Sequence, residues 1–408
     1  MAILCGTDLS TASAGALAVA RAIAALRGDA EVVVVHVIDE DTDARQVRVE
    51  LEAHVKASGP GVPVRAELVI GPADATLVAF AEDLGSDLIV IAASSKGTDL
   101  GTTAERVVAT TRVPVLMVRD PAPLLAFARA ERPMRVLVGV DDTIASELAV
   151  QWTHAARRRG PIDVVVGAVY YPDDAAERYG LEAKTLVDRD PEIERMLARD
   201  LLKRFGATDR VTAAVRRGLG RIGDHVIELA NEAGAEVIVV GTSQRTGLGK
   251  LGSVSSVIVQ SAPQSVVCVP PNAAIPTLVP PRLESALVAT DLSQFANRAV
   301  AYAFAAIPER GTVHVVHVVD HDAAVDEAAL QQTLLALTPA NSQRAVHAYI
   351  VRGDDAATAI AQTASRLGAD LICIASHSRS GITRAIMGSV ADKLLRATRT
   401  PVLVLRPG

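Results

Sequence analysis

Blocks of two kinds alternate along the chain. Short apolar runs rich in Val, Ile and Leu predict strands, and longer stretches with apolar residues at helical spacing, such as Ala14–Leu26, predict helices between them. The first predicted strands are Ile3–Thr7, Val32–Ile38, Val64–Ile70, Leu88–Ala92 and Val115–Val118. The next are Val136–Val140, Val164–Val169, Thr212–Arg216, Val237–Gly241 and Val266–Val269. The last are Ala286–Thr290, Val313–Val319, Ala345–Val351, Leu371–Ala375 and Val402–Leu405.

This block pattern occurs three times. Three tails match, namely LIVIAASSKGTDLGTTAERVVATTRVPVLMVR, VIVVGTSQRTGLGKLGSVSSVIVQSAPQSVVCVP and LICIASHSRSGITRAIMGSVADKLLRATRTPVLVLRP. Three openings also match, namely ILCGTDLSTAS, VLVGVDDTIAS and LVATDLSQFAN. Because the period is that of a domain rather than of a solenoid repeat, we predict three domains, at residues 1–120, 134–271 and 283–408.

The order of elements also predicts the fold class. Strict alternation of strand and helix is typical of an α/β domain with a parallel sheet and right-handed crossovers. Strands that are apolar on both faces predict helices on both faces of the sheet. The proline-containing segments Asp120–Pro133 and Pro270–Arg282 are predicted to be stiff linkers without helix or sheet, and Pro172–Gly206 predicts a helical insertion in the second domain.

Composition narrows the class of protein. Half of the 408 residues are hydrophobic but only 3% are aromatic, so the cores are expected to consist of Val, Ile, Leu and Ala. A net charge of −6 argues against a nucleic-acid surface. No apolar run reaches the roughly 20 residues of a membrane span and no signal peptide is recognisable, so we expect a cytoplasmic protein. The three cysteines lie in apolar runs without CxxC spacing and are expected to be buried thiols.

An aspartate follows the opening strand of each domain: Asp8, Asp141 and Asp291. Ligands of open α/β sheets bind outside the carboxyl ends of the strands, where such a carboxylate can accept hydrogen bonds from a ribose hydroxyl or an exocyclic amine. Aspartate is also favoured as the N-cap of a following helix. The sequence leaves both roles open.

A glycine followed by Ser or Thr precedes the fourth helix of each domain. The pairs are Gly101-Thr102, Gly252-Ser253 and Gly388-Ser389. Free N–H groups at such a helix start can bind an anion, whereas the alternative is a plain Ser or Thr N-cap.

Taken together, these motifs resemble those of the universal stress protein family. The tails carry its loop after the fourth strand, and His36-Val37 and His317-Val318 resemble the family's His-Val pair late in the second strand. The resemblance covers nearly the whole chain in three copies. It implies Rossmann-like domains, each with a five-stranded parallel sheet in the order 3-2-1-4-5, and ATP binding in members whose loop is Gly, two residues, Gly, nine residues, then Gly-Ser or Gly-Thr.

Each copy departs from this ATP loop in its own way. The third has the nine-residue spacing, but Ala375 and Ser378 replace the glycines. The second has Gly241 in the first place, Gln244 in the second, and only seven residues before Gly252. In the first, Ala92 and Ser95 (or Ala93 and Lys96) replace the glycines and the loop is shorter by about four residues. Glycine lets the backbone approach phosphates, and Ala or Ser permits some of that approach, whereas Gln244 and a shortened loop are harder to reconcile with a phosphate cradle. We therefore rank nucleotide binding third, then second, then first domain.

The family's nucleotide contacts can be placed on this chain. In the third domain they imply Asp291 at the ribose or adenine, the backbone of Val318 and Val319 at the adenine edge, space at Gly353, and phosphate contacts from the loop and helix start at Ser378, Gly388, Ser389 and Val390. The corresponding residues of the second domain are Asp141, Gly241, Gly252 and Ser253, and those of the first are Asp8, Gly101 and Thr102. ATP would bring Mg²⁺ with it, but no set of metal-binding residues recurs.

No catalytic arrangement recurs among the three copies either. We therefore predict a non-enzymatic stress-response regulator or sensor that binds ATP or another adenine nucleotide. The alternatives are an interaction scaffold that binds no nucleotide and, with less support, a nucleotide hydrolase of related fold.

The fifth strands PVLMV, SVVCV and PVLVL are short, apolar edges that need a partner. Two can pair within the chain, so the third predicts a homodimer through fifth-strand edges. Other protein partners cannot be named from the sequence.

Overall fold

The computed structural model describes most of the chain. The described residues are 2–93, 102–182, 184–206, 209–245, 250–251, 253–274, 283–376 and 388–406.

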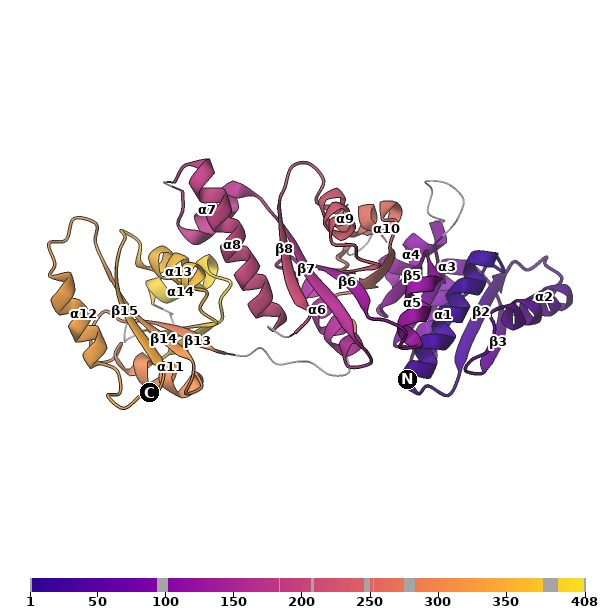
Figure 1. Ribbon diagram of the computed structural model, residues 1–408, viewed down its shortest axis with the longest axis horizontal. Coiled ribbons are helices and arrows are strands. Elements are labelled where there is room, and N and C mark those ends of the chain that lie inside the picture. The colour runs from indigo at the N-terminus through magenta and orange to yellow at the C-terminus, as the bar shows by residue number, and fades with distance from the viewer. Residues whose placement is uncertain are drawn as a thin grey trace, which may run out of the picture. The chain divides into compact units, whose positions relative to one another are not determined.

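The first repeat is a parallel five-stranded sheet with helices on both faces (Figure 1). Its strand order is β3-β2-β1-β4-β5. The strands are β1 (Ile3–Gly6), β2 (Val32–Ile38), β3 (Val64–Ile70), β4 (Leu88–Ala92) and β5 (Val115–Val118). The helices between them are α1 (Thr11–Arg27), α2 (Ala44–Ala57), α3 (Ala73–Asp83) and α4 (Thr102–Thr110).

The second repeat has the same order, β8-β7-β6-β9-β12. Its strands are β6 (Met134–Gly139), β7 (Ile162–Tyr170), β8 (Val211–Arg217), β9 (Val237–Gly241) and β12 (Ser265–Val269). Its helices are α6 (Ile144–Arg157), α9 (Ile222–Glu232) and α10 (Ser253–Ser261), and β10 (Gln244–Arg245) pairs with β11 (Lys250–Leu251) after β9.

The first two repeats share one ten-stranded sheet. They join where β5 and β12 pair antiparallel, with Leu116 opposite Val267. Neither of these two fifth strands is therefore left as an edge, as the apolar character of both predicts.

The third repeat forms a separate five-stranded parallel sheet, β15-β14-β13-β16-β17. Its strands are β13 (Ser285–Ala289), β14 (Thr312–Val319), β15 (Ala345–Arg352), β16 (Leu371–Ala375) and β17 (Val402–Leu405). Its helices are α11 (Arg298–Ala306), α12 (Glu327–Ala336), α13 (Ala356–Leu367) and α14 (Ser389–Ala397). The predicted fold class and the order 3-2-1-4-5 are confirmed in all three repeats.

Aliphatic side chains fill the space on both faces of each sheet. In the first repeat, α1 and α2 cover one face through residues such as Leu17 and Leu51, and α3 and α4 cover the other through Leu77 and Val107. In the third repeat α11 and α12 lie on one face and α13 and α14 on the other. Cys5, Cys268 and Cys373 are buried free thiols, as expected, and burial raises the pKa of each to about 12.

The predicted linker 120–133 is wrong in part, because α5 (Pro121–Ala128) occupies most of it. Proline is tolerated in the first turn of a helix, where its missing N–H has no intrahelical partner. The Asp120 side chain accepts a hydrogen bond from Ala122 N at 2.9 Å and caps the helix. Helix α5 lies beside α1 (Figure 1). Leu124 and Phe127 are buried in the core, so packing fixes the helix.

Two compact units make up the chain. One contains Met1–Tyr170 and Leu201–Val279, and the other contains Tyr171–Asp200 and Pro280–Gly408. The predicted insertion is helical and consists of α7 (Pro172–Tyr179) and α8 (Leu186–Phe205). Most of it therefore belongs to the unit of the third repeat, while the end of α8, with Leu201 and Phe205, is buried in the core of the first unit.

Candidate functional site

The candidate site of each repeat lies at the carboxyl ends of its parallel strands, beside the opening strand. The opening strand has the second and the fourth strand as its neighbours, so the chain leaves the sheet in opposite directions on its two sides. This is the place where open α/β sheets bind ligands.

The three aspartates hold the turn that follows the opening strand. Asp8, Asp141 and Asp291 each accept a hydrogen bond from the backbone N–H two residues later, at 3.0, 2.9 and 2.9 Å, and all three are exposed. They are not N-caps, because Ser10 caps α1 and Thr143 caps α6. The N-cap alternative is therefore wrong for the aspartates themselves. Asp8 and Asp141 each lie two residues before the N-cap, and Asp291 lies six residues before Asn297, the N-cap of α11.

The charge on Asp8 is favoured by its surroundings. Burial raises the pKa of this carboxyl, but hydrogen bonds from Ser10 and Ser13 outweigh it, and the net pKa is below the ordinary value. Asp8 therefore presents a carboxylate to solvent at neutral pH.

The tetrapeptide Thr-Asp-Leu-Ser builds the same turn in the first and third repeats. Leu9 and Leu292 both adopt a left-handed backbone conformation, with φ of 62° and 66°. Each leucine N–H donates to the hydroxyl of the preceding threonine, Thr7 at 3.0 Å and Thr290 at 2.9 Å. Sequence reasoning missed these threonines, although the identical tetrapeptide is a visible signal.

The second hydroxyl contact differs between the two repeats. Thr7 Oγ1 donates to Ser13 Oγ at 2.9 Å and lies 2.9 Å from His54 Nε2, in a buried cluster. Thr290 Oγ1 instead donates to Asn297 Oδ1 at 2.7 Å. Burial lowers the pKa of His54, so the ring is held neutral in this cluster.

The His-Val pairs connect the second strand to the end of the first. His36 Nδ1 lies 2.8 Å from the Thr7 carbonyl oxygen, and His317 Nδ1 lies 2.8 Å from that of Thr290. Since a carbonyl only accepts, Nδ1 carries the proton in both rings. The strand register places Ala168 at the same point of the second repeat, where this connection is missing.

In the third repeat, Ser376 positions the start of α14. Ser376 follows β16, is buried, and its hydroxyl accepts a hydrogen bond from Gly388 N at 2.9 Å. Gly388 is the N-cap of α14 and no side chain caps the helix, while Ser389 and Val390 are exposed. Ser389 is therefore not the N-cap of α14, because Gly388 takes that position. The first-turn N–H groups of α14 lie on the same sheet edge as Asp291, because β13 and β16 are neighbours.

The proposed adenine contacts also lie at this edge. The register of β14 with β13 ends at Val316, so Val318 and Val319 pair only with β15. Gly353 donates its N–H to Val319 O at 3.0 Å. A Cβ added at Gly353 would lie 3.1 Å from Ala359 Cβ, so α13 also requires a small residue there.

The second repeat is organised differently. A Cβ on Gly241 would lie 2.3 Å from the carbonyl carbon of Ala145, so glycine is needed because the first turn of α6 rests on the end of β9. Arg204 in α8 donates to the backbone oxygen of Asp141 at 2.5 Å and to Glu147 at 3.0 Å. This guanidinium therefore covers the backbone oxygen of Asp141 at the turn after the opening strand.

Some predicted residues cannot be placed. Gly101, Gly252 and Ser378 lie outside the described residues. Thr102 and Ser253 begin α4 and α10. Among the residues that are described, no group of three or more His, Cys, Asp or Glu could hold a metal ion.

Comparison with known proteins decides the family. A model described as the universal stress protein family matches residues 1–119, 133–270 and 283–406. The chain belongs to the universal stress protein family. A universal stress protein of Mycobacterium tuberculosis is 29% identical over 294 residues, covering 66% of this chain and 96% of the relative. One from Mycolicibacterium smegmatis is 24% identical over 294 residues, covering 67% and 97%.

The chain also matches solved structures of universal stress proteins. One from Archaeoglobus fulgidus is 19% identical, with a TM-score of 0.49, and covers 66% of this chain and 96% of its own. Another is a universal stress protein in complex with cAMP, 22% identical with a TM-score of 0.25, covering 29% of this chain and 97% of its own. Within the described part of this universal stress protein, no helix is both long and apolar enough to span a membrane.

Proposed function

We propose that this universal stress protein is a non-enzymatic, cytoplasmic stress-response regulator whose third repeat binds an adenine nucleotide such as ATP. The observation that carries the proposal is the glycine-capped start of α14, which the Ser376–Gly388 hydrogen bond holds beside the Asp291 turn. N–H groups at a helix start favour an anion through their partial positive charge.

Each end of a nucleotide has groups to receive it at this edge. Exposed Asp291 can accept from ribose hydroxyls, and the backbone of Val318 and Val319, beyond its pairing with β13, can pair with an adenine edge. The N–H groups at Ser389 and Val390 can receive phosphates, with Mg²⁺ accompanying ATP. Ser378 belongs to the proposed set of contacts, and Gly388 contributes by positioning the helix start, because its N–H donates to Ser376.

The second and first repeats rank lower. Gly241 is in contact with α6 and Arg204 occupies the Asp141 backbone, which leaves less room for a ribose in the second repeat. In the first repeat His54 fills the space near Asp8 with a buried side chain. We keep 1–120, 134–271 and 283–408 as the proposed domain boundaries.

Titration calorimetry of the full chain with ATP, AMP and cAMP tests the proposal. We expect binding that Asp291→Asn weakens at least about tenfold, since a hydrogen bond to a charged group contributes roughly 1.5–3 kcal/mol. Asp8→Asn is the matched control, because Asp8 sits in the same Thr-Asp-Leu-Ser turn of the first repeat. Absence of binding by the folded chain at about 1 mM nucleotide would favour the nucleotide-free interaction scaffold instead.

The hydrolase alternative has a distinct signature. It requires release of phosphate from ATP by the purified chain, abolished by Asp291→Ala. We expect no turnover, and sustained phosphate release would contradict a non-enzymatic role.

We also propose a homodimer through the edge of β17. β5 and β12 cover each other, whereas β17 has only β16 as a strand neighbour within the described residues. Leu403 on this strand is 36% exposed. A second copy would cover these groups across a two-fold axis.

A further inference from the structure

The insertion packs on the third repeat, with which it shares a compact unit. Helix α7 lies against α13 in that unit. The amide of Gln362 in α13 donates to the carbonyl oxygen of Glu177 at 3.1 Å and to the Glu182 carboxylate at 3.3 Å. The two partners are far apart in sequence, so this is a tertiary contact rather than a local turn.

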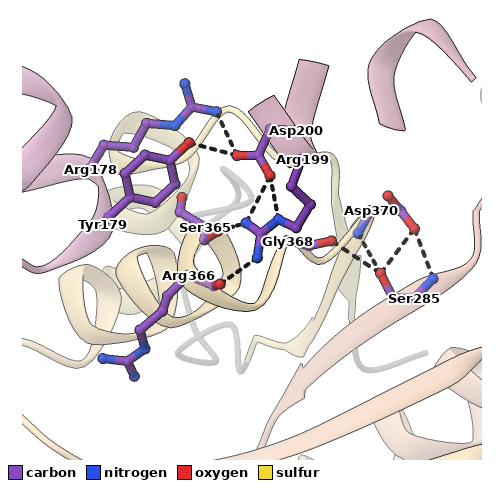
Figure 2. A network of polar contacts seen from close by, with 9 residues as sticks. All are labelled: Arg178, Tyr179, Arg199, Asp200, Ser285, Ser365, Arg366, Gly368 and Asp370. Carbon is purple, nitrogen blue, oxygen red and sulfur yellow. Dashed lines mark hydrogen bonds and ion pairs between the residues drawn. The ribbon is translucent and has the colours of Figure 1, made fainter. Parts of the chain in front are cut away.

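A single arginine from α8 caps the end of α13 (Figure 2). Arg199 donates from Nη2 to Ser365 O and from Nη1 to Arg366 O, both at 2.7 Å. The last carbonyls of a helix lack intrahelical partners and carry a partial negative charge. A guanidinium with two donors therefore fits this helix end in both geometry and charge.

Asp200 orients that guanidinium. Its carboxylate accepts from Arg199 Nε at 3.0 Å and Nη2 at 2.8 Å, and from the hydroxyl of Tyr179 at 2.7 Å (Figure 2). The Tyr179 side chain is fully buried, and burial raises the pKa of its hydroxyl. Contacts within the insertion itself, between Asp200, Arg199 and Tyr179, therefore position the guanidinium that meets α13.

Two glycines make the fit reciprocal. Gly368 ends α13 with φ of +64°, and a Cβ there would lie 2.7 Å from Arg199 Cζ. Gly180 ends α7 with φ of +65°, and a Cβ there would lie 3.2 Å from Gln362 Oε1. In each case, the absence of a side chain at the glycine that ends the helix makes room for a polar side chain: Arg199 at Gly368 and Gln362 at Gly180.

We propose that α7 and residues 186–200 of α8 form a docking module whose partner is the glycine-terminated end of α13. The module holds the third repeat non-covalently, in addition to the covalent connection through residues 275–282. Because the central contact is between a guanidinium and helix carbonyls, added salt weakens it but does not abolish it.

Cutting the connection in the full chain tests this docking. A site-specific protease sequence inserted after Ala274 separates the third repeat from the preceding residues once the folded protein has been cleaved. We expect the C-terminal fragment to co-elute with a tagged N-terminal fragment at micromolar concentration. Separate elution of two folded fragments in low salt would overturn the proposal.

Substitutions then locate the contact. Arg199→Ala should weaken the association of the cut fragments by about tenfold or more, which corresponds to about 1.4 kcal/mol. Arg195→Ala is the matched control, because Arg195 is an exposed arginine of the same helix. Equal fragment affinity in Arg199→Ala and Arg195→Ala would contradict the role of Arg199.

A second variant guards against misfolding of the first. Gln362→Ala removes the contacts with Glu177 and Glu182 from the opposite side of the interface. It should weaken fragment association while circular dichroism of the uncut chain stays unchanged. Unchanged affinity in Gln362→Ala would show that α7 is not part of the module.

Discussion

The backbone N–H of Gly388 donates to the hydroxyl of Ser376 at 2.9 Å, and this bond joins the end of β16 to the start of α14 in the third repeat. Residues 377–387 lie between them in the sequence and belong to the stretch that resembles the family's ATP motif. The bond therefore ties the end of β16 to the N-cap of α14. We expect nucleotide affinity to depend on this hydrogen bond indirectly, because the bond positions the start of α14.

Ser376→Ala should lower nucleotide affinity of the third repeat about fivefold. The substitution removes one hydrogen bond with a net contribution of about 1 kcal/mol and lets the helix start move. Calorimetry with ATP measures the effect. Thr242→Ala, at the buried residue that follows β9 in the second repeat, is the matched control and should leave ATP affinity unchanged. An affinity equal to that of the parent in Ser376→Ala would contradict this role.

Gly241→Ala should destabilise the first unit by about 1–3 kcal/mol. The added methyl group would overlap the Ala145 carbonyl in the first turn of α6, which must shift. Urea unfolding followed by circular dichroism gives the change. Gly28→Ala is the comparison, because Gly28 has φ of +77° and open space around it, so it should cost only about 1 kcal/mol of backbone strain. A larger loss of unfolding free energy in Gly241→Ala than in Gly28→Ala would support the close approach of α6 to β9, and the reverse order would contradict it.

The stability of the first unit should fall as pH is lowered. Burial lowers the pKa of His54, and burial likewise lowers that of His154. The folded state then binds fewer protons than the unfolded state, whose histidines titrate near pH of about 6.5. The stabilisation is therefore complete above that pH and is lost progressively below it.

His54→Gln should reduce this dependence. We expect the urea midpoint to fall less between pH of about 7 and about 5 in the variant than in the parent, because one proton-linked group is gone. His347→Gln serves as the control, since His347 is exposed. Parallel pH profiles for the parent and His54→Gln would contradict the assignment.

Leu403→Glu should convert the proposed dimer to a monomer. It places a charge on the β17 edge, where a second strand would pair. Light scattering at micromolar concentration measures the mass. Leu395→Glu is the control, because Leu395 is 42% exposed on α14 rather than on the strand. A parent chain that is already monomeric at this concentration would remove the basis for the dimer.

Much of the fold could be predicted from the sequence because the strands are apolar on both faces. The predicted ranges Leu88–Ala92 and Val237–Gly241 coincide with β4 and β9. Successive residues of these strands are buried, so each strand is visible in the sequence as a continuous apolar run. Helix α5 could not be predicted in the same way. Its prolines suggest a linker, and only the burial of Leu124 and Phe127 reveals that packing favours a helix.

The candidate site was predictable only at its local motifs. The aspartate turns and the helix starts follow from neighbouring residues. The contact of His54 with Thr7 joins residues 47 apart, and that of Arg199 with Ser365 joins residues 166 apart, so neither leaves a local signal in the sequence. Gly241 illustrates a different problem. It stands at a position of the ATP motif, but the structure requires glycine there because the first turn of α6 leaves no room for a Cβ.

The strands β5 and β12 pair antiparallel, but they are different segments of one chain, so a mutation in one strand leaves the sequence of the other unchanged. The residues that follow them already differ: Arg119 follows β5 and donates to Val259 O at 2.8 Å, whereas Pro270 follows β12. A seam between two copies of β17 would lack this freedom, since Arg406 would stand on both sides. A single substitution there would be present twice and would count twice in the energy of association. The first two repeats have escaped that constraint by sharing one chain.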